Sequence, residues 1–223
     1  MKYPEPTLGA VYKYIDLSHT IEDGMPVYPG DGGVKLYQDR FLDKDGFNNS
    51  RLETGMHAGT HLDLPSHFLD LNVSVDQLAL ERFVGTGCLL DVRNEQVIDM
   101  KPEYETKVQE NDIVLLSTGF GRHLKSESYF TDHPVVDQRL AEFLAAKKIK
   151  MVGMDLPSPD REPFEIHRIL LQADILIMEN LTNLNLLLGV RNFEVIAFPL
   201  KVKAEAALLR AVARVCENRP ERA

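Results

Sequence analysis

Three of the seven histidines in this 223-residue chain lie in one short segment that also carries an aspartate, and together they could bind a metal ion. The residues are His57, His61, Asp63 and His67. In an extended strand, His57 and His61 would lie roughly 13 Å apart, too far to share one ion. A turn at Gly59 would instead bring positions i and i+4 to about 6 Å. With Asp63 as an anionic oxygen ligand, the segment predicts an open site for zinc, manganese or iron.

His67 is better placed as a proton carrier, or as a group that supports the metal ligands, than as a ligand itself, because it lies beyond Pro65 and imidazole titrates near neutral pH. The segment is not the H-E-x-x-H helix of metalloproteases, since Ala58 and Gly59 follow His57 and a proline would end the helix. The simpler alternative is a surface loop or a buried turn whose imidazoles are all hydrogen-bonded. A single histidine would favour that alternative, whereas three histidines and an aspartate favour the metal site.

Short apolar and β-branched segments, separated by turn residues, predict strands along most of the chain. These segments are residues 14–17, 88–92, 113–118, 150–154, 175–178 and 193–200. Apolar stripes predict only two good helices, at about residues 136–148 and 164–173. We therefore expect a mixed α/β fold, a single domain over residues 1–223 with a β-rich, barrel-like core and few helices.

The composition disfavours several classes of partner. A net charge of −9 would repel nucleic acid phosphates and anionic lipid surfaces. No apolar stretch approaches the roughly 20 residues that span a bilayer, and the first ten residues do not resemble a signal peptide, so we expect no membrane partner and a cytoplasmic location. Cys88 and Cys216 are too far apart in sequence for C-x-x-C spacing, so His, Asp and Glu must hold any metal.

Residues 57–67 read H-A-G-T-H-L-D-L-P-S-H, which resembles the H-x-G-T-H-x-D-x-P-x-H signature of the cyclase family of metal-dependent hydrolases. That family includes bacterial kynurenine formamidases and isatin hydrolases. Further blocks resemble the family at residues 16–19, 25–31, 152–155, 158–160 and 178–183. Because these blocks keep the family's order over most of the chain, the sequence is identified as a member.

The resemblance implies a swivelling β/β/α fold, a homodimer or homotetramer, and one or two zinc or manganese ions per chain. It adds His167 and Glu179 to the three ligands proposed above, and it places Tyr28 beside the substrate. From the residues alone, His167 could be a partly buried core residue and Tyr28 a half-buried turn residue. Glu179 ends an apolar run, where a buried carboxylate would need a cation or a donor, although a solvent-exposed strand end is the alternative.

One segment departs from the family pattern. Many members carry a glycine- and aspartate-rich loop before a closing strand, whereas residues 203–210 here read K-A-E-A-A-L-L-R. Alanine, glutamate and leucine favour helix, although residues 210–213 resemble the family's final strand. Because that loop lies near the pocket in relatives, the departure weakens an inference about formamide specificity.

We expect a metal-dependent amidohydrolase that acts on C–N bonds other than peptide bonds. Its substrate would be a small aryl formamide like N-formylkynurenine, attacked at the carbonyl carbon by a metal-activated water. His67 would carry the proton to the leaving group. The alternatives are hydrolysis or ring closure of a cyclic amide, imide or lactone, and, in another class, a catalytically silent metal-binding protein that would not need His67.

Overall fold

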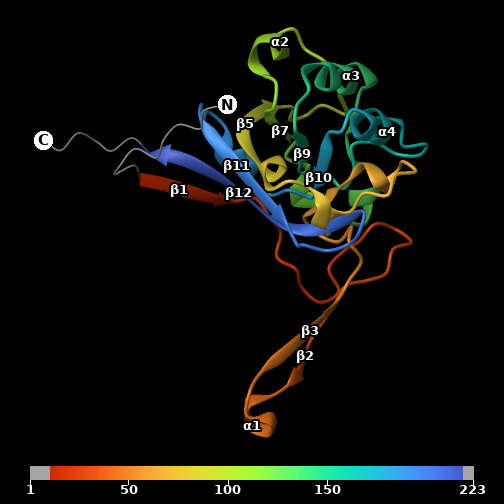
Figure 1. Ribbon diagram of the computed structural model, residues 1–223, viewed down its shortest axis with the longest axis vertical. Coiled ribbons are helices and arrows are strands. Elements are labelled where there is room, and N and C mark those ends of the chain that lie inside the picture. Colours follow the sequence, from red (N-terminus) through yellow and green to blue (C-terminus); the bar gives the residue numbers. More distant parts are fainter. Residues whose placement is uncertain (1–10, 218–223) are drawn as a thin grey trace, which may run out of the picture.

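A computed structural model describes residues 11–217 and contains a large mixed sheet with three of its short helices, α2, α3 and α4, gathered on one side (Figure 1). The strands are β1 (Val11–Asp16), β2 (Lys35–Arg40), β3 (Asn49–Glu53), β4 (His61–Asp63), β5 (Val84–Asp91), β6 (Val97–Ile98), β7 (Ile113–Ser117), β8 (Val135–Val136), β9 (Met151–Met154), β10 (Leu176–Glu179), β11 (Phe193–Pro199) and β12 (Ala206–Glu217). The helices are α1 (Leu42–Asp45), α2 (Tyr104–Lys107), α3 (Gln138–Lys147) and α4 (Glu165–Gln172). None of the helices in the described region has the length and hydropathy that a membrane span requires.

Seven strands close into a barrel in the order β12-β11-β5-β7-β9-β10-β4, and pairing of β4 with β12 completes the ring. The neighbours β5, β7, β9 and β10 run parallel, whereas β4, β11 and β12 pair antiparallel. Closure depends on the length of β12, because its first residues pair with β4 and its later residues pair with β11 and β1. As a result, the short strand β4 has a partner on each side instead of forming an exposed edge.

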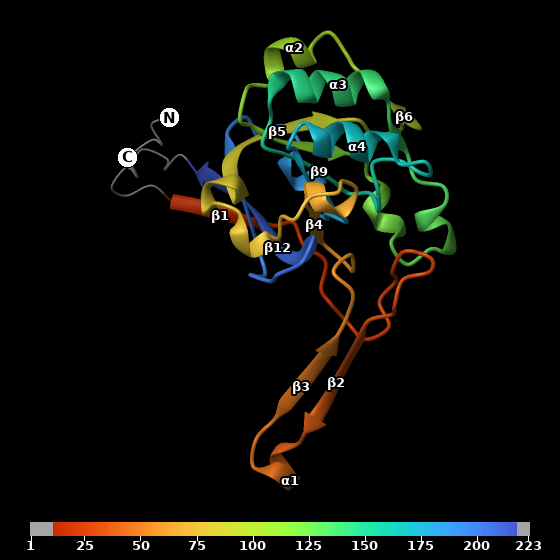
Figure 2. The ribbon, with the colours of Figure 1, turned by 45° about the vertical axis from the view of Figure 1, so that its right-hand side comes forward.

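The side chains of the barrel strands divide between two cores. One set, which includes Leu62, Leu115 and Met178, packs together in one core that we assign to the barrel interior. The alternate set, which includes Val114 and Ile177, packs in a second core with residues of α3 and α4, the helices that lie along one side of the sheet in Figure 2. Successive strand residues face opposite sides, and the parallel strands carry apolar side chains on both faces over most of their length.

A hairpin of β2 and β3 projects from the barrel with α1 at its tip (Figures 1 and 2). Its two strands pair only with each other, in an antiparallel two-stranded sheet. None of residues 35–53 is buried. We call residues 35–53 the arm.

The mixed α/β fold with a barrel-like core is confirmed, and each predicted strand and helix overlaps an observed one. Residues 203–210 do not form the helix that their composition favours, because β12 begins at Ala206 and pairs with neighbours on both sides. Strand β4 and the arm were not among the predicted strands. The first is only three residues long, and the second has no buried residue.

Candidate metal centre

A left-handed turn at Gly59 brings His57 and His61 together. Gly59 has a φ of +58°, and a Cβ there would lie 2.8 Å from Cδ1 of Ile21, so a larger residue would be strained. The Gly59 carbonyl accepts a hydrogen bond from Nδ1 of His61 at 2.9 Å. The centres of the two imidazole rings lie 5.2 Å apart. The turn therefore provides the proximity that a continuous strand would not allow.

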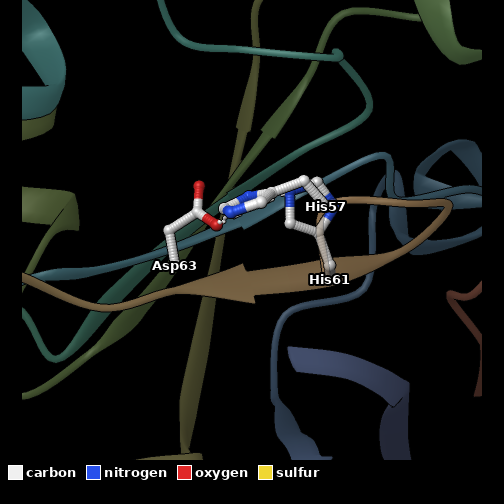
Figure 3. A group of neighbouring side chains, drawn as sticks. All are labelled: His57, His61 and Asp63. Atoms are coloured by element: carbon white, nitrogen blue, oxygen red, sulfur yellow. Dashed lines mark ion pairs between the residues drawn. The ribbon is translucent and has the colours of Figure 1, made fainter. Parts of the chain in front are cut away.

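Strand β4 presents His61 and Asp63 on one face. Because Leu62 between them packs in the barrel-interior core, both polar side chains face outward, toward the side covered by helices. The register of β10 against β4 sets Glu179 directly opposite His61, and the Cβ atoms of such pairs lie about 5 Å apart. Figure 3 shows the His57 and His61 rings beside the Asp63 carboxylate.

The first turn of α4 carries His167. Asp160 caps this helix, because one of its oxygens accepts hydrogen bonds from the backbone N–H groups of Ile166 at 2.6 Å and His167 at 3.3 Å. Its other oxygen accepts a hydrogen bond from Nδ1 of His167 at 2.6 Å. The remaining ring nitrogen, Nε2, lies 3.3 Å from Oε1 of Glu179. Asp160 thus orients both the helix start and the imidazole.

The structure gathers all five side chains that the sequence analysis named as metal ligands into two groups that share Asp63. His57, His61 and Asp63 form one group and Asp63, His167 and Glu179 form the other, each with potential ligand atoms within 4.8 Å of one another. Oδ1 of Asp63 lies 2.9 Å from Nδ1 of His57 and 3.6 Å from Nε2 of His61. Asp63 therefore occupies the middle of the cluster.

Burial and charge act in opposite directions on these groups. Burial alone would lower the pKa of His61, but the charges of Asp63 and Glu179 outweigh it and raise that pKa to about 9. Burial would likewise lower the pKa of His167, but Asp160 and Glu179 raise it to about 10. Burial would raise the pKa of Asp63, yet the neighbouring histidines hold it well below its usual range. Without metal, the cluster is stabilised by protons on its histidines.

Three buried polar atoms of the cluster have no well-aligned hydrogen bond within the described residues. They are Nε2 of His61, Oδ1 of Asp63 and Oε1 of Glu179. Polar atoms that are buried without such a partner cost free energy. Because imidazole nitrogens and carboxylate oxygens are ligands for zinc and manganese, a divalent cation would satisfy all three, and the residues fit a metal site.

The second ring nitrogen of each histidine in the cluster also faces an acceptor. His61 uses a backbone carbonyl and His167 uses Asp160, as described above. For His57, Nε2 lies 3.5 Å from Oε1 of Glu205. Acceptors in these positions orient the imidazoles of metal sites and raise their basicity.

The sequence analysis missed Asp160 and Glu205. Asp160 was included only in the block 158–160 that resembles the family, with no role assigned to it. Its place shortly before a helix that carries a candidate histidine is the one signal that could have identified it. Glu205 lies in the segment that departs from the family pattern, and it reaches His57 through the pairing of β12 with β4. No local spacing relates those two residues.

A pocket of about 230 Å³ opens beside the cluster. None of the described residues that line it is a lysine or an arginine. Tyr28, the residue expected beside the substrate, packs edge-on against Phe130 with ring centres 5.9 Å apart. The walls carry four aromatic side chains, namely Tyr28, Phe68, Phe130 and Phe164. Such walls suit a compact planar group without charge.

His67 lines this pocket beside the cluster. It ends the 3-10 turn Pro65–His67, which follows β4 almost directly. Its ring centre lies 4.2 Å from that of His57 and 6.3 Å from that of His167. Burial, only partly offset by the charge of Asp63, lowers the pKa of His67. The imidazole is therefore neutral near pH 7 and can accept a proton.

Known proteins resemble this chain in sequence and in fold. The family model described as "Putative cyclase" matches residues 15–161. Kynurenine formamidase of Bacillus cereus is 29% identical over 207 residues, which cover 91% of this chain and 97% of that protein. A solved structure from Bacillus stearothermophilus, named a "predicted metal-dependent hydrolase", is 27% identical with a TM-score of 0.75 and covers 92% of this chain and 99% of its own.

Isatin hydrolase A from Ralstonia solanacearum superposes with a TM-score of 0.82 over 92% of each chain, but at 22% identity it shows a common fold alone. The formamidase and hydrolase relatives support the prediction of a metal-dependent amidohydrolase that acts on C–N bonds. The family model spans more than half of the chain and includes the His57–His67 segment. This chain therefore belongs to the cyclase family, as its sequence motifs predicted.

Proposed function

We propose that this chain is a divalent-metal amidohydrolase that cleaves a small aryl formamide such as N-formylkynurenine. The observation that carries the proposal is the buried cluster of three histidines and two carboxylates beside an aromatic pocket. The formamidase relative supports cleavage of a C–N bond. Zinc or manganese suits the donor set, at one or two ions per chain. A cytoplasmic location and a homodimer or homotetramer complete the proposal.

The two groups of the cluster would each hold a cation. His57 and His61 belong to one group, His167 and Glu179 to the other, and Asp63 lies between them. When bound, a divalent cation lowers the pKa of a coordinated water toward neutrality and polarises a carbonyl oxygen. The shared position of Asp63 suits a bridging carboxylate if both groups are occupied.

The residues of the pocket supply proton transfer and orientation. His67 accepts a proton from water as the water oxygen bonds to the formyl carbon, and it donates that proton to the leaving nitrogen as the C–N bond breaks. The products are formate and an aryl amine. Tyr28, Phe68 and Phe164 hold the aromatic ring, which fixes the carbonyl carbon near the cluster and excludes bulk water.

A second substrate class is a cyclic amide, imide or lactone. The observation that favours it is the lack of lysine and arginine among the described residues that line the pocket. The amino-acid carboxylate of N-formylkynurenine would have no cationic partner among them, whereas an uncharged ring needs none. Opening such a ring uses the same proton transfers, and ring closure reverses them.

Turnover of three substrates tests the proposed reaction. The substrates are N-formylkynurenine, an aryl formamide without the amino-acid group, and a cyclic lactam fused to an aryl ring. We expect hydrolysis of at least one, loss of activity on chelation, and recovery with zinc or manganese. If chelation leaves the turnover of every hydrolysed substrate unchanged, the proposal is wrong. If none of the three is hydrolysed, a catalytically silent metal-binding protein is favoured.

Replacement of His67 by alanine is expected to keep the metal and lose turnover. The imidazole contributes proton transfer, which accounts for roughly 10²–10⁴-fold in kcat. Metal content and kcat are measured on the same preparation. His123→Ala, which removes an exposed histidine outside the pocket, is the matched control and should change neither quantity. Full activity of His67→Ala would exclude His67 as the proton carrier.

Asp160→Asn and Glu205→Gln are expected to weaken metal binding while leaving the fold intact. Each change keeps the shape of the side chain but removes the charge that orients an imidazole, an effect of about 10–100-fold in affinity. The loss should be larger for Asp160, because the Glu205 side chain is 43% exposed. Competition with a chromophoric chelator measures the affinity. Glu194→Gln, whose carboxylate pairs with Arg214 on β12, is the control, and equal affinities for it and Asp160→Asn would contradict the assignment.

Metal affinity is expected to rise with pH. In the metal-free protein the pKa is about 9 for His61 and about 10 for His167, so both rings are protonated at pH 7 and must lose protons to bind metal. Below the lower pKa, each displaced proton makes the affinity about tenfold tighter per pH unit. Chelator competition between about pH 6.5 and 8.5, with calorimetry in two buffers to count released protons, measures this effect. A constant affinity over that range would contradict it.

A further inference from the structure

Asn180 follows Glu179 directly in the chain and lines the same pocket. In a regular strand the two side chains would face opposite sides. Here Asn180 has a φ of +54°, a left-handed conformation that asparagine adopts more readily than most residues. Met178 and Leu181, on either side of the pair, both pack in the barrel-interior core. The break in alternation therefore turns two consecutive polar side chains toward the pocket.

Hydrogen bonds hold the backbone of Asn180 in this position. Its N–H donates to the carbonyl of Leu156 at 2.8 Å, and its carbonyl accepts from the hydroxyl of Thr60 at 2.6 Å. Asn180 is only 4% exposed. Its side chain therefore starts from a fixed backbone and has little room to change rotamer.

The hydroxyl of Tyr129 fixes which end of the Asn180 amide it meets. Tyr129 is fully buried, and its hydroxyl donates to Oδ1 of Asn180 at 2.9 Å. Burial raises the pKa of this hydroxyl, so it keeps the proton that it donates. With the amide turned over, Nδ2 would face the hydroxyl, and the hydroxyl hydrogen would have no acceptor, because it makes no other hydrogen bond within residues 11–217. Tyr129 therefore directs Nδ2 away from itself.

The amide nitrogen of Asn180 is an uncommitted donor. Nδ2 makes no hydrogen bond within the described part of the chain, yet it is not one of the fully enclosed unpartnered atoms there, so one side of it stays open. Since Asn180 lines the pocket, that side faces the pocket. Ser158 also lines it, but its hydroxyl donates to the carbonyl of Asp160 at 2.8 Å. A ligand in the pocket therefore meets a neutral N–H donor that is already oriented.

The position of this donor determines which ligand atom it meets. Consecutive Cα atoms lie about 3.8 Å apart, so Asn180 is at the end of the pocket that holds Glu179 and the metal cluster. Aromatic side chains make up other walls. An aryl compound that packs its ring on those walls and directs its reacting carbon to the cluster brings a carbonyl oxygen to the same end. That oxygen is an acceptor without charge, which suits a neutral donor.

We infer that the Nδ2–H group of Asn180 donates a hydrogen bond to the carbonyl oxygen of an aryl carbonyl compound in the pocket. Its part in catalysis rests on the proposed hydrolysis. As a water oxygen bonds to the carbonyl carbon, the π electron pair moves onto the carbonyl oxygen. The N–H group keeps its proton and stabilises the negative charge that develops there. Tyr129, which holds the amide from behind, is a positioning residue.

Side-chain NMR tests the contact without turnover. Protein dialysed against zinc and labelled with ¹⁵N-asparagine is titrated with acetophenone, an aryl ketone that water does not cleave. Ethylbenzene, which has the same carbon skeleton without the oxygen, is the control ligand. The Nδ2 signals of Asn180, identified by their absence from Asn180→Ala, are expected to move downfield with acetophenone only. No movement at the highest acetophenone concentration, or equal movement with ethylbenzene, overturns the inference.

Kinetics test the catalytic part. Asn180→Ala is expected to lower kcat by about 10²–10³-fold on whichever of the three substrates the wild type hydrolyses, with a smaller change in KM and unchanged metal content. Asn183→Ala is the matched control, because Asn183 has a similar φ of +59° but is exposed and lies outside the pocket. Equal kcat values for the two variants would overturn the catalytic role. A wild type that hydrolyses none of the substrates would contradict the proposed function, and the NMR titration would still decide the contact.

Tyr129→Phe tests the positioning role. The variant loses the hydroxyl that holds Oδ1 of Asn180, and a fall in kcat of about 5–10-fold is expected. In the Asn180→Ala background the same change should alter kcat less than about twofold, because the side chain through which Tyr129 acts is absent. A loss of the same size in both backgrounds would show that Tyr129 does not act through Asn180.

Discussion

The buried charge of Asp63 and Glu179 is the constraint on which this structure depends. Two carboxylates on neighbouring strands repel each other and lose hydration, so they can remain ionised only if positive charge lies beside them. In the metal-free protein, protons on the adjacent histidines provide that charge, and the raised pKa values of His61 and His167 are its signature. A divalent cation can bind the same ligand atoms in place of those protons. When bound, it would also supply the chemistry that hydrolysis needs.

Each structural feature around the cluster brings a partner to these carboxylates. Closure of the barrel through β12 holds β4 between two strands and sets His61 opposite Glu179. The turn at Gly59 returns His57 to the same face, and Asp160, which accepts hydrogen bonds from the first turn of α4, directs His167 inward. The arm is joined to the site at both of its ends. Strand β2 starts four residues after Asp31, which lines the pocket, and β3 ends four residues before His57.

The sequence predicted the parts of this site that are local in the chain. His57, His61, Asp63 and His67 could be grouped from spacing and the turn at Gly59, and most barrel strands were visible as apolar runs. His167 and Glu179 lie at least 100 residues away, so only resemblance to a family could add them. Glu205 could not be predicted at all, since its contact with His57 exists only through strand pairing, and the intrinsic preference of residues 203–210 for helix pointed the other way.

The central claim is that these buried groups hold a divalent cation. Elemental analysis of protein that has been stripped of metal, dialysed against zinc or manganese and freed of unbound ions measures this directly. Asp63→Ala, which removes the carboxylate common to both groups, is the companion variant. The account predicts one or two ions per wild-type chain and a loss of bound metal in the variant. Wild-type protein that retains no metal after this treatment would contradict it.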